Sequence, residues 1–266
     1  MPTARVLAQR FGAELQTISV AGADDDVDQL RAHASTALGV ALADRRALVV
    51  TGVDAAQTIA QRAEELGACA VCMATHGRGR LHGAVVGSVA RSMFQRSSEA
   101  VVALGPLADN PGWSPRPRSW PEPLSVERMV VCVDGSDTSE EVLPVSAAWA
   151  RELGMSMSIL TIVDDQAPLD RPAHHSTYGS SGDADTYIAE LVQRWRGTIP
   201  DVDGVVVRDP IGLASGFRAH LRERPAGLVA LTTHARSGMQ RVLLGAAAAN
   251  IVQASVAPCL VVPLRS

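Results

Sequence analysis

Short apolar runs alternate with amphipathic segments along the whole chain. Residues 69–74 and 156–163, for example, have the length and residue types of buried strands, and residues 54–66 carry apolar side chains at helical spacing. Strands that alternate with helices predict a parallel sheet covered by helices on both faces. We expect strands at 14–21, 46–51, 69–74, 100–104, 128–133, 156–163, 204–208, 228–232 and 259–263, and helices at 3–11, 24–38, 54–66, 89–96, 140–153, 183–196, 213–223 and 246–255.

One stretch of the chain occurs twice. Residues 69–88 align without a gap with residues 227–246, so that His76 matches His234 and Gly87 matches Gly245. A repeat of this length indicates a duplicated domain rather than a solenoid unit. We therefore expect a first domain at 1–105, a linker at 106–127 that is rich in proline and cannot form a helix, and a second domain at 128–266.

The first domain begins inside its first helix. When Phe11 and Gly12 are aligned with Leu153 and Gly154, nothing in the first half matches the strand at 129–134. The first strand of a doubly wound sheet usually lies in its middle, so we expect a native start about fifteen residues upstream. The rival interpretation is that another segment fills the gap.

Composition excludes several classes of function. All 24 basic residues among the 266 are arginine, which excludes a Walker-A lysine and a Schiff-base lysine. The net charge of −4 gives no reason to expect nucleic acid or an anionic membrane as a partner. Without a signal peptide or an apolar run of spanning length, we expect a cytoplasmic protein.

No pattern in the sequence indicates a metal site or a catalytic site. Cys69, Cys72, Cys132 and Cys259 all lie in apolar runs, and we interpret them as buried structural thiols. Cys69 and Cys72 form a C-x-x-C, but positions three apart on a strand face opposite sides. We find neither zinc-ligand spacing, nor a catalytic triad, nor a carboxylate pair with a recognisable base.

The repeated stretch has the form of an anion-binding loop. In the first copy a strand ending at Ala74 leads into a loop with several glycines, and Ser88 opens the next helix. Glycines let backbone N–H groups approach a phosphate, and the helix N-terminus adds unpaired donors, although such loops also occur without a ligand. His76 could donate to a phosphate or only support the loop, and Arg78 and Arg80 could meet a phosphate or water.

The second half opens with a recognisable strand and turn. The strand at 128–133 ends in Asp134-Gly-Ser-Asp-Thr-Ser139, and Thr138 or Ser139 can cap the helix that follows. Asp134 could serve a ligand or simply cap the end of its strand. Gly154 ends the helix before the next strand.

These motifs together resemble the universal stress protein family. The resemblance rests on Val130-Val-Cys-Val-Asp-Gly-Ser136, on Gly154, and on Ala74-Thr-His-Gly77 with Gly87-Ser88, and it is closest to the tandem two-domain members. It implies a Rossmann-like α/β fold of two doubly wound parallel-sheet domains, the first without its N-terminal strand here. It also implies that the domains join through their last strands as a pseudo-dimer, and that the protein forms homo-oligomers.

The resemblance further implies a site for ATP or AMP, with Mg²⁺ accompanying ATP, although some members bind no nucleotide. Binders carry G-x2-G-x9-G-S/T after the fourth strand and an aspartate at the end of the first. The first half reads Ala74-x2-Gly77-x9-Gly87-Ser88, and the second half reads Thr232-x2-Ala235-x9-Gly245-Ala246 but keeps Asp134. The implied contacts are Ala74, Thr75, His76, Gly77, Gly87, Ser88 and Val89, with a degenerate second site at Asp134 and Gly245.

Three hypotheses on function follow. The first is a regulatory stress-response protein that holds an adenine nucleotide in its first half, which the retained Gly77, Gly87 and Ser88 favour. The second is a nucleotide-free scaffold for protein contacts, which the degenerate second motif favours. The third is a slow ATPase, for which no residue marks a general base.

Overall fold

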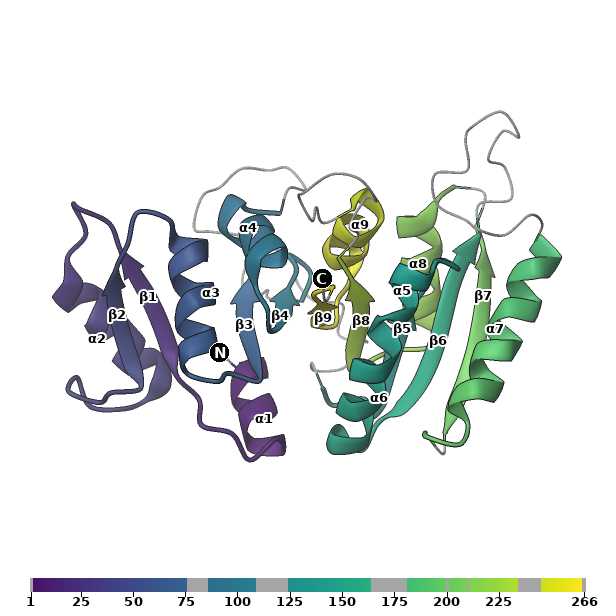
Figure 1. The fold of residues 1–266 in the computed structure, drawn as a ribbon, viewed down its shortest axis with the longest axis horizontal. Helices are drawn as coiled ribbons and strands as arrows, with labels where there is room; N and C mark the ends of the chain where they lie inside the picture. Colours follow the sequence, from purple (N-terminus) through teal and green to yellow (C-terminus); the bar gives the residue numbers. More distant parts are fainter. Residues whose placement is uncertain are drawn as a thin grey trace.

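The computed structural model describes residues 2–75, 86–108, 124–163, 181–199, 201–209, 211–233 and 245–264. Helices and strands alternate along the described chain, as the sequence predicts (Figure 1). The helices are α1 (Pro2–Arg10), α2 (Val27–Leu38), α3 (Ala55–Glu65), α4 (Ser88–Arg96), α5 (Asp137–Glu140), α6 (Val142–Leu153), α7 (Ser181–Trp195), α8 (Leu213–Glu223) and α9 (Ala246–Ala254). The strands are β1 (Thr17–Ala21), β2 (Ala47–Thr51), β3 (Ala70–Ala74), β4 (Ala100–Leu104), β5 (Arg128–Cys132), β6 (Ser156–Val163), β7 (Val202–Arg208), β8 (Leu228–Thr232) and β9 (Cys259–Val262).

The second half contains a complete parallel sheet in the order β9-β8-β5-β6-β7, with its first strand, β5, in the middle. Side chains alternate across β5, so that Met129 and Val131 join the core beneath α6 and α7, while Val130 joins the core with Phe217 of α8 on the other face. β5 is therefore buried on both faces, as an apolar run in a doubly wound fold requires.

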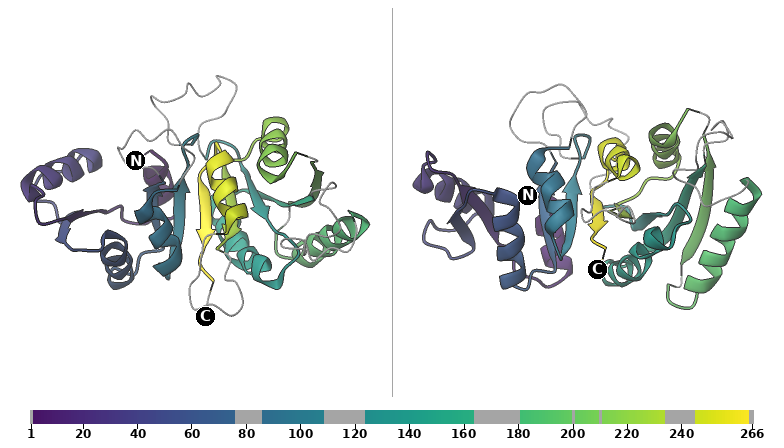
Figure 2. Two further views of the ribbon diagram at one scale, coloured as in Figure 1. Left: turned by 90° about the horizontal axis from the view of Figure 1, so that it is seen from above. Right: turned by 45° about the horizontal axis from the view of Figure 1, so that its top comes forward.

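The first half is divided between two sheets. β3 and β4 extend the sheet of the second half, whereas β1 and β2 pair only with each other in the described chain. This pair lies at one end of the molecule beside α2 (Figures 1 and 2). The interruption falls between β1 and β3, where the second half has β5, and no strand among the described residues occupies that position, as the sequence predicts.

The two halves join through their last strands, as the family resemblance implies. β4 and β9 pair antiparallel, with Val101 opposite Val261 and Ala103 opposite Cys259, and they complete a seven-stranded sheet. Gly105 comes directly after β4 and packs tightly against α9. An added Cβ at this position would lie 2.1 Å from the Val252 carbonyl oxygen. The domain boundaries at 105 and 128 stay a prediction, and most of the expected linker lies outside the described residues.

The predicted helix at 140–153 is wrong at its start. The chain first forms the short helix α5, which Ser136 caps by accepting a hydrogen bond from the Ser139 N–H group at 3.1 Å. Neither Thr138 nor Ser139 is the cap, because Gly135, at φ +81°, turns the chain so that Ser136 is the residue before the first helical turn. Gly154 ends α6 in the left-handed conformation, as expected.

Candidate functional site

Thr75 ties the end of β3 to the beginning of α4. Its backbone N–H group and its Oγ1 both donate to the Leu104 carbonyl oxygen, at 2.9 Å and 3.2 Å. Its own carbonyl oxygen accepts from the Gly87 N–H group at 2.8 Å. Thr75 is fully buried, so these bonds hold the first residue of the α4 cap against the carboxyl end of the strand.

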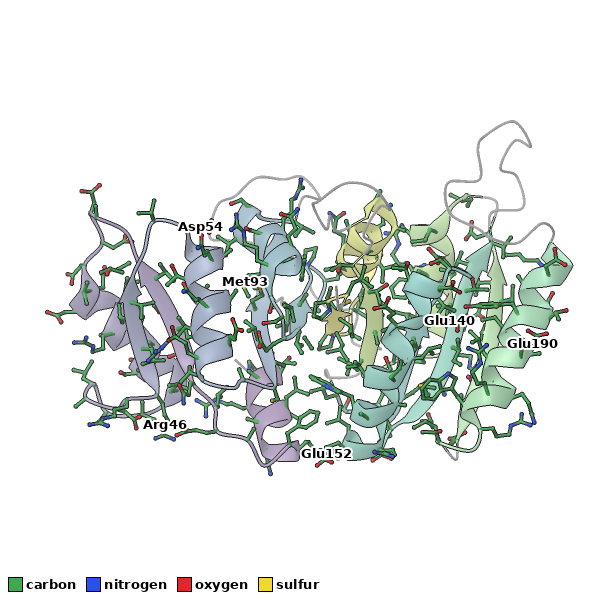
Figure 3. The ribbon with its side chains drawn as sticks, viewed as in Figure 1. Arg46, Asp54, Met93, Glu140, Glu152 and Glu190 are labelled. Atoms are coloured by element: carbon green, nitrogen blue, oxygen red, sulfur yellow. The ribbon has the colours of Figure 1, made fainter. Side chains whose placement is uncertain are left out.

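The packing of α4 fixes the direction of its N-terminus. Met93 is fully buried among Ala56 and Ala60 of α3 and Val71 and Met73 of β3 (Figure 3). The N-terminus of α4 is therefore held at the carboxyl end of β3. In open α/β sheets this edge is where ligands bind.

Gly87 leaves the N-terminus of α4 without a side-chain cap. It adopts φ −57° and ψ 156°, and its carbonyl oxygen accepts the first helical hydrogen bond from the Arg91 N–H group at 2.9 Å. The N–H groups of Ser88, Val89 and Ala90 therefore precede the helical ladder. An added Cβ on Gly87 would lie 3.1 Å from the Thr75 carbonyl oxygen. Close packing against Thr75 is therefore a reason for glycine at this position, in addition to the close approach of a ligand.

Two side chains project from this helix start. Ser88, at the first helical position, and Val89, at the second, are both exposed, with 38% of Val89 accessible. One hydroxyl and one apolar side chain thus stand beside N–H groups that have no partner among the described residues. Ala74 is half-buried at the end of β3.

The second half has the same backbone arrangement at the start of α9 but different side chains. Gly245 precedes α9 at φ −60° and ψ 156°, again without a side-chain cap, and accepts from the Ala249 N–H group at 2.9 Å. Thr233 is buried like Thr75 and donates its N–H to the Val262 carbonyl oxygen at 3.3 Å. Ala246 stands where the first half has Ser88, so the backbone is kept and the hydroxyl is lost.

Asp134 at the carboxyl end of β5 is oriented by the turn that follows it. Its Oδ1 accepts from the Ser136 N–H group at 3.1 Å and from Ser136 Oγ at 2.6 Å, and its own N–H donates to Ser139 Oγ. The carboxylate is half-buried and belongs to the second half, whereas Gly87 and Ser88 belong to the first. The retained aspartate and the retained loop serine therefore come from different halves.

Several predicted site residues lie outside the described part of the chain. These are His76, Gly77, Arg78 and Arg80 of the first half, and His234 and Ala235 of the second.

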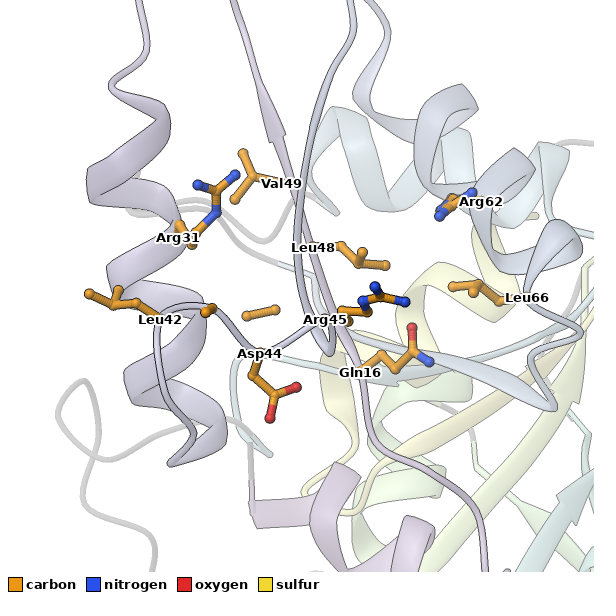
Figure 4. Close-up of a pocket in the computed structure, with 11 residues that line it drawn as sticks. Gln16, Arg31, Leu42, Asp44, Arg45, Leu48, Val49, Arg62 and Leu66 are labelled. Atoms are coloured by element: carbon orange, nitrogen blue, oxygen red, sulfur yellow. The ribbon is translucent and has the colours of Figure 1, made fainter.

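One surface cavity is not indicated by the sequence. It has a volume of about 560 Å³ and lies near the amino ends of β1 and β2, beside α2 and α3 (Figure 4). Arg31 of α2, Arg45 of the turn before β2 and Arg62 of α3 line it. Two of them form ion pairs, Arg31 with Asp28 at 3.8 Å and Arg62 with Glu65 at 2.5 Å. No motif joins these arginines, so the sequence held no signal for this cavity.

The cysteines differ more from one another than the sequence suggests. Cys259 is buried and Cys72 and Cys132 are half-buried, but Cys69 is exposed and precedes β3, so the interpretation as a buried thiol is wrong for Cys69. Burial raises the pKa of Cys72 and of Cys259 to about 12 and also raises that of Cys132. The described residues contain no group of three or more histidine, cysteine, aspartate or glutamate side chains that could hold a metal.

Comparison with known proteins decides the family. The universal stress protein family model matches residues 4–104 and 125–263. The chain belongs to the universal stress protein family. Curated relatives include the universal stress proteins Rv1996 of Mycobacterium tuberculosis strain H37Rv and Mb2019 of Mycobacterium bovis, each 28% identical over 195 residues, which is 72% of this chain but 57% of the relative.

Solved structures agree on the fold of this family member. A universal stress protein of Archaeoglobus fulgidus DSM 4304 superposes with a TM-score of 0.60 at 14% identity, covering 95% of this chain and 89% of that one. A functionally unknown protein of Pseudomonas aeruginosa PAO1 gives 0.58 at 13% identity over 98% and 85%. None of the helices in the described ranges has the length and apolar character that a bilayer crossing requires.

Proposed function

We propose that this universal stress protein is a regulatory stress-response protein that binds one adenine nucleotide, ATP or AMP, in its first half. The observation that carries this is the N-terminus of α4, which begins at Gly87 without a side-chain cap beside the carboxyl end of β3. Ala74, Thr75, Gly87, Ser88 and Val89 are the described residues of the site.

A phosphate suits this position for two reasons. The N–H groups of Ser88, Val89 and Ala90 are donors that have no partner within the helix, and the helix dipole places partial positive charge at the same end. The exposed Ser88 hydroxyl adds a donor, and Mg²⁺ would accompany a triphosphate. The second half lacks that hydroxyl at Ala246, which supports one nucleotide per chain rather than two.

The test is equilibrium dialysis of the purified chain with radiolabelled ATP and AMP, with and without Mg²⁺. The decisive variant is Val89→Asp. A carboxylate in the first turn of a helix is favourable by about 0.3–1 kcal/mol, so the fold is kept while a bound phosphate is repelled. We expect nucleotide binding to be lost without a fall in Tm.

The chain offers matched controls for this test. Ala247 occupies the position of Val89 in α9, so Ala247→Asp adds the same charge to the other half and leaves binding unchanged. Ser88→Ala weakens binding, whereas Ser98→Ala, beyond the opposite end of α4, does not. Equal loss in Val89→Asp and Ala247→Asp would count against a site at α4.

A nucleotide-free scaffold is the second candidate, and the pairing of β4 with β9 favours it. This pairing joins the halves through the main chain of Val101 to Ala103 and needs no ligand. Absence of ATP and AMP binding in the same dialysis would select the scaffold. Phosphate release in those samples tests slow ATP hydrolysis, and homo-oligomers and a cytoplasmic location stay predictions.

A further inference from the structure

We propose that the arginine-lined cavity beside β2 binds a small organic anion, one that joins a phosphate or carboxylate group to an apolar body. The cavity lies near the amino ends of β1 and β2, whereas the N-terminus of α4 lies at the carboxyl end of β3. The two places are distinct, so an anion in the cavity would be bound in addition to the proposed nucleotide.

The size and the apolar part of the lining suit an organic molecule. The volume of about 560 Å³ falls within the range of about 300–1,000 Å³ that is usual for pockets that hold small molecules, and a lone phosphate ion would fill little of it. Leu42, Leu48, Val49 and Leu66 supply apolar walls, and Leu42 and Leu66 are 59% and 40% exposed. An apolar ligand body that covered these leucines would be stabilised by removing them from water.

The polar part of the lining carries positive charge. Arg31, Arg45 and Arg62 contribute three guanidinium groups, and Asp44 is the only carboxylate among the described lining residues (Figure 4). Asp44 is already paired with Arg46, whose Nε and Nη2 donate to its two oxygens at 3.0 Å and 2.7 Å. Because Arg46 is not part of the lining, it matches the charge of Asp44 and leaves the three guanidinium groups in excess.

These guanidinium groups have donors to offer a ligand. Arg45 is exposed and forms no ion pair or side-chain hydrogen bond with the described residues. The Nε atom of Arg62 is buried and likewise lacks a hydrogen-bond partner within the described ranges. The pairs of Arg31 with Asp28 and of Arg62 with Glu65 are at the surface, where an ion pair contributes little and can be exchanged for a ligand. A planar guanidinium group can donate two parallel hydrogen bonds to a phosphate or a carboxylate.

The second half has different side chains at the corresponding place. The helices α3 and α8 have equal length and keep the alignment of the repeat, so Arg62 corresponds to His220 and Leu66 to Arg224. His220 is buried beneath α8, whereas Arg62 borders an open cavity. The cavity is therefore a feature of the first half and not of the fold in general.

The second half also supplies an acid that the first half lacks. By strand register, Ala47 of β2 has the position of Gly204 of β7, so Arg46 corresponds to Asp203. Asp203 forms an ion pair with Arg224 and so neutralises an arginine from within the chain. In the first half an arginine replaces this acid. An anionic ligand would take the part that the Asp203 carboxylate has in the second half.

The cavity is separate from the interruption in the sheet. β1 lies between β2 and the interruption, and the lining comes from α2, the turn before β2, β2 itself, α3 with its C-cap Leu66, and Gln16 before β1. A strand that filled the interruption would pair with β1 and β3 rather than with β2. The arginines would keep their places around the cavity.

The test is isothermal titration calorimetry of the full chain with 1-naphthyl phosphate and with 1-naphthoate. Both carry an oxyanion on the same apolar body, so the tighter of the two identifies the preferred head group. We expect saturable 1:1 binding of at least one of them. Neutral 1-naphthol and inorganic phosphate each lack one part of the ligand and should bind at least about ten-fold more weakly.

Variants of the lining locate the bound anion. Arg45→Gln and Arg62→Gln should each weaken binding about three- to ten-fold, because each removes charge-assisted hydrogen bonds. Arg151→Gln, at an exposed position of α6, removes the same charge from the second half and should change affinity less than about two-fold. Leu66→Arg adds a guanidinium group on an apolar stem and should strengthen binding about three-fold or more, a gain that a misfolded variant would not show.

Four outcomes would overturn the proposal. They are no saturable binding of either anion, binding of 1-naphthol as tight as that of the anions, equal affinity in the parent and both glutamine variants of the lining, and loss of binding in Val89→Asp, which would place the anion at α4. Unchanged binding in Val89→Asp is the expected result. ATP and AMP binding is measured separately, so failure of the nucleotide site and failure of the cavity site are distinct results.

Discussion

The ring of Phe11 meets the ring of Trp149 edge to face, with centroids 4.7 Å apart and planes inclined at 62°. Phe11 directly follows α1 of the first half, and Trp149 lies in α6 of the second. Arg10 supports the contact by donating from Nη1 to the Leu153 carbonyl oxygen at 3.4 Å. The beginning of the first half is therefore attached to the second half independently of β4 and β9.

Replacing either ring should loosen this attachment. An aromatic pair of this geometry contributes about 0.5–1.5 kcal/mol beyond the area it buries. We expect a double-mutant cycle of Phe11→Leu and Trp149→Leu, followed by urea unfolding, to give a coupling energy in that range. Phe11→Leu with Phe217→Leu is the control, because Phe217 lies in the core on the other face of the sheet and should give additive effects. A coupling near zero for the first pair would contradict the prediction.

Gly105 should not tolerate a larger residue. Its added Cβ would lie 2.1 Å from the backbone oxygen of Val252, so α9 and the end of β4 would have to separate. We expect Gly105→Ala to lower the free energy of unfolding by about 2 kcal/mol or more. Gly197→Ala is the matched control, because a Cβ there has no atom within 4 Å, and it should change stability by less than about 0.5 kcal/mol. Similar losses in both variants would be inconsistent with the packing of α9.

One of the four thiols should react quickly with a disulfide reagent at neutral pH. Cys69 is exposed, whereas burial raises the pKa of Cys72 and of Cys259 to about 12 and also raises that of Cys132, which lowers their thiolate fraction. We expect one fast equivalent in the folded chain, its absence in Cys69→Ser, and four equivalents in denaturant. Two or more fast equivalents would show that the strands open readily.

His220 should make the second half less stable as the pH falls. Burial, followed by the charges of Arg224 and Arg128, lowers its pKa below the ordinary 6.5, and its Nε2 has no hydrogen-bond partner among the described residues. The folded state therefore binds fewer protons than the unfolded state, so stability is full above pH 6.5 and is lost as the pH drops toward the lowered pKa.

His220→Leu removes this contribution and leaves an apolar side chain in the same place. Between pH 7.5 and pH 5.5 we expect its free energy of unfolding to fall less than that of the parent chain. Equal slopes for His220→Leu and the parent would mean that His220 binds the same number of protons in the folded and unfolded states, and so that its pKa is not lowered by folding.

Much of the fold follows from local pattern and the repeat. The run at 100–104 is a strand and the segment at 213–223 is a helix, both with the predicted bounds, because the first is continuously apolar and the second has apolar side chains at helical spacing. The interruption beside β1 was predictable because the second copy of the repeat shows which strand is lacking. Which residue after Asp134 caps the next helix could not be predicted. The positive φ of Gly135 decides it, and the sequence does not reveal that angle.

The candidate site was predicted in outline only. The sequence identified Gly87 and Ser88 from their place after an apolar run, but it gave no sign that buried Thr75 bonds to Leu104 and Gly87 together. Those bonds depend on β4 lying beside β3, a contact between residues about thirty positions apart. The arginine-lined cavity was missed for the same reason, because three separate elements build it.

The division of the first half sets how the chain should come apart. By the sequence repeat, the first half of the chain ends near residue 105. By strand pairing, however, the break between the two sheets lies between β2 and β3. β1, β2 and α2 share a small core around Ala34, Leu38 and Ala47, and a two-stranded sheet of this size is marginal by itself. Cooperative unfolding should therefore have its boundary inside the first half, with residues 15–51 melting as one unit before a larger unit in which β3 and β4 melt together with the second half.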